Sequence, residues 1–131
     1  MKKFILPFLI LALLLTACGG VATNSPDEQQ GVTKKGDTIT TTVGSEFKIV
    51  VRARKPSTGY HWEVAEAIDA TLVEYVWKDF VPDFPGDADS TGREYWRFNA
   101  VAPGQTTITL GLYLGMTDVA SQTLEVTVTI Q

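Results

Sequence analysis

The chain has 131 residues, and its 11 Lys and Arg against 15 Asp and Glu give a formal net charge of −4. An acidic chain without a cluster of Lys and Arg argues against nucleic acid as a partner. Because the whole sequence holds one His, a two-His metal site cannot be built, and we expect no cofactor. A Cys-His catalytic pair would need the single Cys, Cys18, to which the N-terminal pattern assigns another role.

The N-terminus has the organisation of an export signal. Lys2 and Lys3 supply a positive start, and residues 4–15 form an apolar run. About 12 residues are too few to span a bilayer as a helix, which needs roughly 20, so the run fits a cleaved signal peptide. Its end, LTAC, resembles the lipobox of bacterial lipoproteins, in which the thiol of the Cys, here Cys18, takes a lipid before cleavage. The alternative is an ordinary signal peptide with a Cys there by chance.

Three segments follow from this pattern. We expect residues 1–17 to be a lipoprotein signal peptide, and residues 18–36 to be an acylated Cys18 with a polar, flexible tether. The lipid would hold the exported chain at the plasma or outer membrane of the cell envelope. Residues 37–131 are enough for one domain, which we expect to be a monomer. Since Cys18 is the single Cys, that domain must be held together by its core without a disulfide.

Period-two alternation dominates the domain and predicts strands. In chain order, the strands are predicted at 38–43, 46–54, 60–62, 72–78, 95–100, 107–112 and 123–130. Val73, Tyr75 and Trp77 are predicted to share one side of their strand. No segment with a helical period follows the signal. About seven short strands with turns between them indicate an all-β, antiparallel β-sandwich.

Turn-forming residues separate the strands into two groups of connections. Loops are predicted at 55–60, 81–92 and 114–122, and tight turns at 44–45 and 103–104. Alternate connections of an antiparallel sandwich lie at the same end, so we expect the three loops together and the two turns opposite. Loops gathered at one end of a sandwich are a common way to build a binding surface.

The inventory of chemical groups does not favour an enzyme. His61, the single His, lies beside Tyr60 and is typical of a strand surface, and there is no Gly-x-Ser-x-Gly motif. Asp87 and Asp89 partly match a calcium loop, but the twelfth position is Phe98 where a bidentate Glu is needed. These two residues are weak calcium candidates, and the alternative is a polar loop rich in turn-forming residues.

Residues 55–62 (KPSTGYHW) are the most informative segment. Pro56 fixes one backbone angle, and Gly59 permits an angle that L-residues avoid. A rigid, slim and uncharged loop of this kind can enter a narrow cleft at low entropic cost. Tyr60 and Trp62 share a side of the following strand and would hold that strand on the core. The alternative is a plain turn followed by two core aromatics.

This segment resembles the Asn-Pro-Thr-Thr-Gly-Tyr-x-Trp signature of chagasin-type inhibitors of papain-like cysteine peptidases, and the resemblance covers most of the chain after about Asp37. It implies an immunoglobulin-like sandwich of Greek-key type, whose three loops fill the active-site cleft of the peptidase without being cleaved. The resemblance places Thr58 nearest the catalytic Cys of the target. The loop residues that it implies for peptidase binding are Pro56, Ser57, Thr58, Gly59, Tyr60, Ser90, Thr91, Gly92, Leu114, Gly115, Met116 and Thr117.

Two loops depart from the pattern of the family. The second loop typically carries Gly-x-Gly-Gly, where this chain has residues 89–92 (DSTG) and keeps the last Gly. The third typically carries Arg-Pro-Trp, where this chain has residues 114–116 (LGM). Two hypotheses result. The first is an envelope-anchored inhibitor of papain-like peptidases. The second is a non-inhibitory binding or scaffold module of the envelope, with calcium dependence as one form of it.

Overall fold

The computed structural model describes residues 31–131, so the predicted signal peptide, Cys18 and most of the tether lie outside the described residues. Residues 31–131 form seven strands and one 3₁₀ turn: β1 (Thr38–Thr41), β2 (Glu46–Ala53), η1 (Pro56–Thr58), β3 (Tyr60–Val64), β4 (Val73–Pro82), β5 (Gly92–Ala100), β6 (Gly104–Leu114) and β7 (Gln122–Ile130). The predicted all-β fold with about seven strands is confirmed. No helix within this range is long and apolar enough to cross a membrane.

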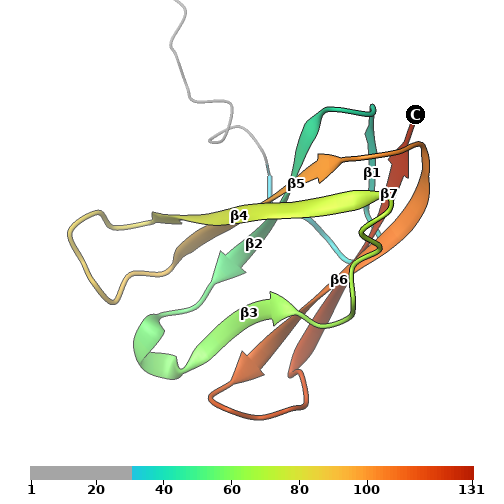
Figure 1. Ribbon diagram of the computed structural model, residues 1–131. Helices are drawn as coiled ribbons and strands as arrows, with labels where there is room; N and C mark the ends of the chain where they lie inside the picture. Colours follow the sequence, from blue (N-terminus) through green and yellow to red (C-terminus); the bar gives the residue numbers. More distant parts are fainter. Residues whose placement is uncertain (1–30) are drawn as a thin grey trace, which may run out of the picture.

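The strands form two packed sheets, with the order β1-β7-β6-β3 in one and β2-β5-β4 in the other (Figure 1). Strands that are distant in sequence are neighbours in space, as in β2-β5 and β3-β6, which is the Greek-key arrangement of an immunoglobulin-like sandwich. One pair departs from the antiparallel expectation, because β1 runs parallel to β7. The turn after β1 carries the chain into the other sheet, so β1 and β2 do not form a hairpin.

The core lies between the two sheets and follows the alternation of the sequence. Phe47, Ile49 and Val51 of β2 are buried, and the ring of Phe47 stacks on Phe98 of β5 with centroids 5.4 Å apart. The other sheet contributes the buried aliphatic side chains Ile108, Leu110, Leu112, Leu124, Val126, Val128 and Ile130. Full burial of one such side chain contributes roughly 1.5–3 kcal/mol. This core stabilises the domain without a disulfide.

A bulge in β4 overturns part of the predicted strand pattern. Tyr75 pairs with Phe98, and the next paired residue is Trp77, which faces Arg97, so Val76 is the extra residue. The extra residue reverses the alternation. Trp77 therefore does not share a side with Val73 and Tyr75: it lies on the outer face, 48% exposed, with the Arg97 guanidinium 5.1 Å from its ring centroid.

The boundaries of two predicted loops and of the tether also shift. Val81 and Pro82 pair with β5, so the second loop spans residues 83–91, and the third spans residues 115–121. The folded part begins before residue 37, because Thr33 exchanges hydrogen bonds with Val50 of β2. The Gly36 N–H also donates to the carbonyl oxygen of Glu125 in β7.

Candidate functional site

The three long loops lie at one end of the sandwich, as predicted. The first loop (residues 55–59) is bonded to both of the others: Ser57 donates to the Asp89 carboxylate of the second loop, and the Gly59 carbonyl accepts the N–H of Gly115 in the third. In Figure 1 the first and third loops point to the bottom of the view and the second extends to the left. The turn at residues 42–45 lies at the opposite end, where Gly44 donates to Ala100.

The first loop is a single 3₁₀ turn with defined ends. Pro56 starts η1 with the φ angle that the turn needs, and Gly59 ends it with φ of 77°, in the left-handed region. The N–H of Gly59 donates to the Pro56 carbonyl at 3.1 Å. The Lys55 carbonyl accepts both the N–H of Thr58 at 3.0 Å and its hydroxyl at 2.6 Å. The side chains of η1 are all exposed, so the loop is a rigid projection with small residues at its tip.

The strand that follows the loop is held on the core by two aromatic side chains, as predicted. Trp62 is 8% exposed, and its indole N–H donates to the carbonyl of Arg52 in the other sheet at 2.9 Å. Tyr60 is half-buried beneath the Arg54 guanidinium, which lies 4.4 Å from its ring centroid. His61 points to the outer face of the strand, beside Tyr113. The position of the first loop is thus coupled to the packing of both sheets.

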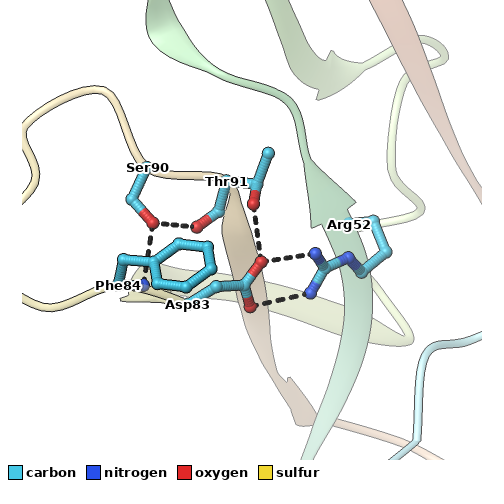
Figure 2. Close-up of polar contacts among 5 residues, drawn as sticks. All are labelled: Arg52, Asp83, Phe84, Ser90 and Thr91. Atoms are coloured by element: carbon cyan, nitrogen blue, oxygen red, sulfur yellow. Dashed lines mark hydrogen bonds and ion pairs between the residues drawn. The ribbon is translucent and has the colours of Figure 1, made fainter.

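The second loop is closed at its base by a network of ionic and hydroxyl contacts (Figure 2). Both terminal guanidinium nitrogens of Arg52 donate to the two oxygens of Asp83, at 3.0 and 2.5 Å. The Thr91 hydroxyl donates to the same carboxylate at 2.7 Å. The bonds from Arg52 and Thr91 lower the pKa of Asp83 to about 2. The network therefore joins β2 to both ends of the second loop at neutral pH.

Within the second loop, two of the residues that the resemblance implied for binding have structural positions. Ser90 is 2% exposed; its hydroxyl accepts the N–H of Phe84 and donates to the carbonyl of Thr91 (Figure 2). Gly92 is buried at the first position of β5. The exposed part of this loop is instead residues 83–88, where Phe84 is 66% exposed. An aromatic residue between Asp83 and Pro85 was the signal in the sequence that could have identified this part of the loop.

The position of Gly92 leaves no room for a side chain. An added Cβ would lie 2.4 Å from the Val81 carbonyl oxygen and 2.5 Å from the ring of Phe80. We expect Gly92→Ala to lower the free energy of unfolding by about 1–3 kcal/mol, because the backbone of β4 must shift. The matched control is Gly111→Ala, whose Cβ would meet the ring of Tyr113, which can rotate away. Urea denaturation compares the two, and an equal effect would contradict the prediction.

The third loop presents apolar side chains to solvent. Met116 is fully exposed, and Leu114 and Val119 are exposed as well. Residues 114–116 carry no charge. The hydroxyl and N–H of Thr117 both bond to the Leu114 carbonyl and close the loop. Exposed apolar side chains that cluster on one end of a domain are typical of an interaction surface. Val119 was missed by the sequence analysis, although it lies in the predicted third loop.

The loop end offers a shape for binding. A groove of about 400 Å³ runs beside the first loop and is lined by Pro56, Tyr60 and Phe80. Over residues 31–131, no three His, Cys, Asp or Glu side chains gather as metal ligands would. Of the calcium candidates, Asp89 directs both oxygens to Ser57, and Asp87 accepts the N–H of Asp89. Neither carboxylate is arranged around a cation position.

Comparison with known proteins agrees with this geometry. A structure of a cysteine protease inhibitor from Entamoeba histolytica, EhICP2, is similar with a TM-score of 0.59 and 21% identity, over 75% of this chain and 88% of that one. The solution structure of amebosin is similar with a TM-score of 0.59 and 24% identity, over 75% of this chain and 91% of that one. At these identities the likeness establishes the fold.

A search of curated proteins finds no match. The model of the chagasin family peptidase inhibitor I42 matches residues 40–130, which is more than half of the chain and includes all three loops. The sandwich topology, the bonded loop end and this match agree, and the chain belongs to the chagasin family of peptidase inhibitors.

Proposed function

We propose that this protein inhibits papain-like cysteine peptidases by inserting the three loops of one end of its sandwich into the active-site cleft, without covalent chemistry. The observation that carries the proposal is the bonded loop cluster, in which a rigid first loop projects between two supporting loops. The family match and the cysteine protease inhibitors among similar structures support the same target class.

The preorganised first loop would favour tight binding. Its turn is already closed by the bonds to the Lys55 and Pro56 carbonyls, and its exit strand is packed by Trp62. Binding therefore needs little ordering of the chain, and less conformational entropy is lost when the cleft is filled. The exposed Met116 supplies a flexible apolar contact for the cleft wall, where the family pattern has an aromatic residue.

The same bonds explain why the loop would resist cleavage. Attack by a cysteine peptidase requires a carbonyl oxygen that can enter the oxyanion hole. In the first loop, the carbonyl oxygens of Lys55, Pro56 and Gly59 accept hydrogen bonds from within the protein. Presenting them to the enzyme requires that the turn be opened first. Attack on these three carbonyls would therefore be disfavoured while the turn stays closed.

The test is a titration of the soluble chain from Gly19 onward against papain and a cathepsin L-type peptidase, with hydrolysis of a small substrate as the readout. We expect reversible, competitive inhibition at submicromolar concentration, and an intact inhibitor after prolonged incubation. A folded chain that gives no inhibition at tens of micromolar would contradict the proposal and favour the non-inhibitory binding or scaffold module.

We further propose that a lipid on Cys18 anchors the inhibitor to the cell envelope. The support is the sequence of residues 1–18, with its positive start, apolar run and lipobox-like end. In a bacterial host, we expect the wild-type chain to fractionate with membranes and to incorporate a palmitate analogue. The Cys18→Ser variant should be unlabelled, because it lacks the thiol that accepts the lipid. Labelling of that variant would contradict the anchor.

A further inference from the structure

We propose that Asp89 is a positioning residue for the first loop, and that its ionised carboxylate sets the affinity for the peptidase by holding Ser57 in place. This inference rests on the proposed function and extends it. One oxygen of Asp89 accepts the Ser57 N–H at 2.7 Å, and the other accepts the Ser57 hydroxyl at 2.7 Å. The two residues are 32 positions apart in sequence, so the contact joins two separate loops.

The arrangement directs the carboxylate inward to the first loop. Asp89 is half-buried, whereas the preceding residues of its loop are exposed. Its own N–H donates to the Asp87 carboxylate at 2.9 Å, which fixes the backbone that carries the side chain. On its other side, Ser90 is buried and bonded within the loop. The Asp89 side chain is therefore presented by a closed loop, and its rotamer is set by two donors from one residue.

Ser57 lies at the centre of η1, next to the tip residue Thr58. The bonds within the turn are to the Lys55 and Pro56 carbonyls, and they fix its internal shape. They do not fix the direction in which the turn projects from the sandwich. The Asp89 carboxylate supplies a bond from outside the turn, as the Gly115 N–H does from the third loop. Without Asp89, the turn should stay closed, but its direction relative to the sandwich should no longer be fixed.

The charge state of Asp89 makes this contact sensitive to acid. Both bonds from Ser57 favour the carboxylate, so they lower the pKa of Asp89 below 3.8, and Lys55 of the first loop acts in the same direction. Asp87, an acidic group of the same loop, accepts the Asp89 N–H. Because the folded-state pKa is depressed, the contact is fully present at neutral pH and is lost as the pH falls through that pKa. A protonated carboxyl accepts hydrogen bonds more weakly than a carboxylate.

The first measurement uses the free chain and needs no peptidase. In an NMR titration from pH 6 to about pH 2, we expect the Ser57 amide shift to follow the Asp89 carboxyl, with a midpoint below 3.8. In Asp89→Asn that transition should disappear while the remaining spectrum is retained. A Ser57 amide that does not respond to Asp89 would overturn the contact itself.

The second measurement is inhibition at neutral pH. We expect Asp89→Ala to raise the inhibition constant by about 10- to 100-fold, as for the loss of a hydrogen-bonded charge. Its melting temperature should stay within a few degrees, since the core is untouched. In the double variant with Ser57→Ala, the two effects should be less than additive, because both variants remove the bond between the Ser57 hydroxyl and Asp89, while the bond from the Ser57 N–H is lost only with Asp89. Additive effects would contradict a positioning role that acts through the Ser57 hydroxyl.

Glu74→Gln is the matched control, because it removes one exposed carboxylate from β4 away from the loops. It should leave the inhibition constant unchanged. An effect equal to that of Asp89→Ala would show that the change in net charge, and not the contact with Ser57, weakens inhibition. An unchanged constant in Asp89→Ala would overturn the positioning role. If the wild-type chain does not inhibit, the proposed function fails and the role in affinity fails with it, while the NMR titration still decides whether the contact exists.

Discussion

Replacing Thr58 by Arg should abolish inhibition, with a rise of the inhibition constant of at least about 100-fold, or more than about 2.7 kcal/mol. Thr58 lies exposed at the tip of the loop that would enter the cleft, and its hydroxyl donates to the Lys55 carbonyl at 2.6 Å. An Arg side chain is several atoms longer and charged, so a slim and uncharged tip is lost. Because the site is exposed, the cost in folding free energy should be about 1 kcal/mol or less. Inhibition constants and melting curves measure the two effects separately.

The chain supplies a matched control for this variant. Thr42 is also an exposed Thr with a hydrogen-bonded hydroxyl, 2.8 Å from that of Ser45, in the turn at the opposite end. Thr42→Arg should leave the inhibition constant unchanged within about twofold, since a surface change away from the interface has little effect. Unaltered inhibition by Thr58→Arg would remove Thr58 from the contact surface, and equal losses in both variants would point to a nonspecific effect of the added charge.

Truncation of Trp62 is expected to have the largest effect on stability. Trp62→Ala removes a buried indole from between the sheets and should cost about 3–5 kcal/mol, a large share of the roughly 5–15 kcal/mol typical of a domain. Trp62→Phe retains an aromatic ring but leaves the Arg52 carbonyl without the indole donor, so it should cost about 1–3 kcal/mol. Urea unfolding of both variants gives the two values.

Trp77→Ala is the control for this series, because Trp77 has the same size but is half exposed on the outer face of β4. Its loss, including the contact with Arg97, should cost about 1 kcal/mol or less. A Trp62→Ala variant as stable as Trp77→Ala would show that the exit strand of the first loop is not held by the core.

The sequence predicted the strands well because their inner faces are apolar at every second position, as in Phe47, Ile49 and Val51. It misplaced Trp77 because one extra residue, Val76, reverses the alternation, and nothing in the local pattern marks a bulge. The parallel pairing of β1 with β7 was also not predictable. Alternation shows which residues face the core, but it does not show which strand lies alongside or in which direction.

The candidate site was likewise predicted only in part from the sequence. The first loop was predicted from Pro56 and Gly59, whose backbone preferences are local and act as expected in η1. The contact between Ser57 and Asp89 was not predicted, because it depends on two loops that meet only in the folded chain. Ser90 was expected at the binding surface, but its hydroxyl serves the closure of its own loop. A small polar residue in a loop has the same local signature in either role.

Hydrogen exchange of the chain with and without papain tests the central claim most directly, which is that one end of the sandwich binds the peptidase. At short exchange times, we expect added protection in residues 55–59, 83–91 and 115–121, with the largest change in the first loop. The turns at residues 42–45 and 101–103, at the opposite end, should exchange as in the free chain. Protection confined to those turns, or no added protection at saturating papain, would contradict the account.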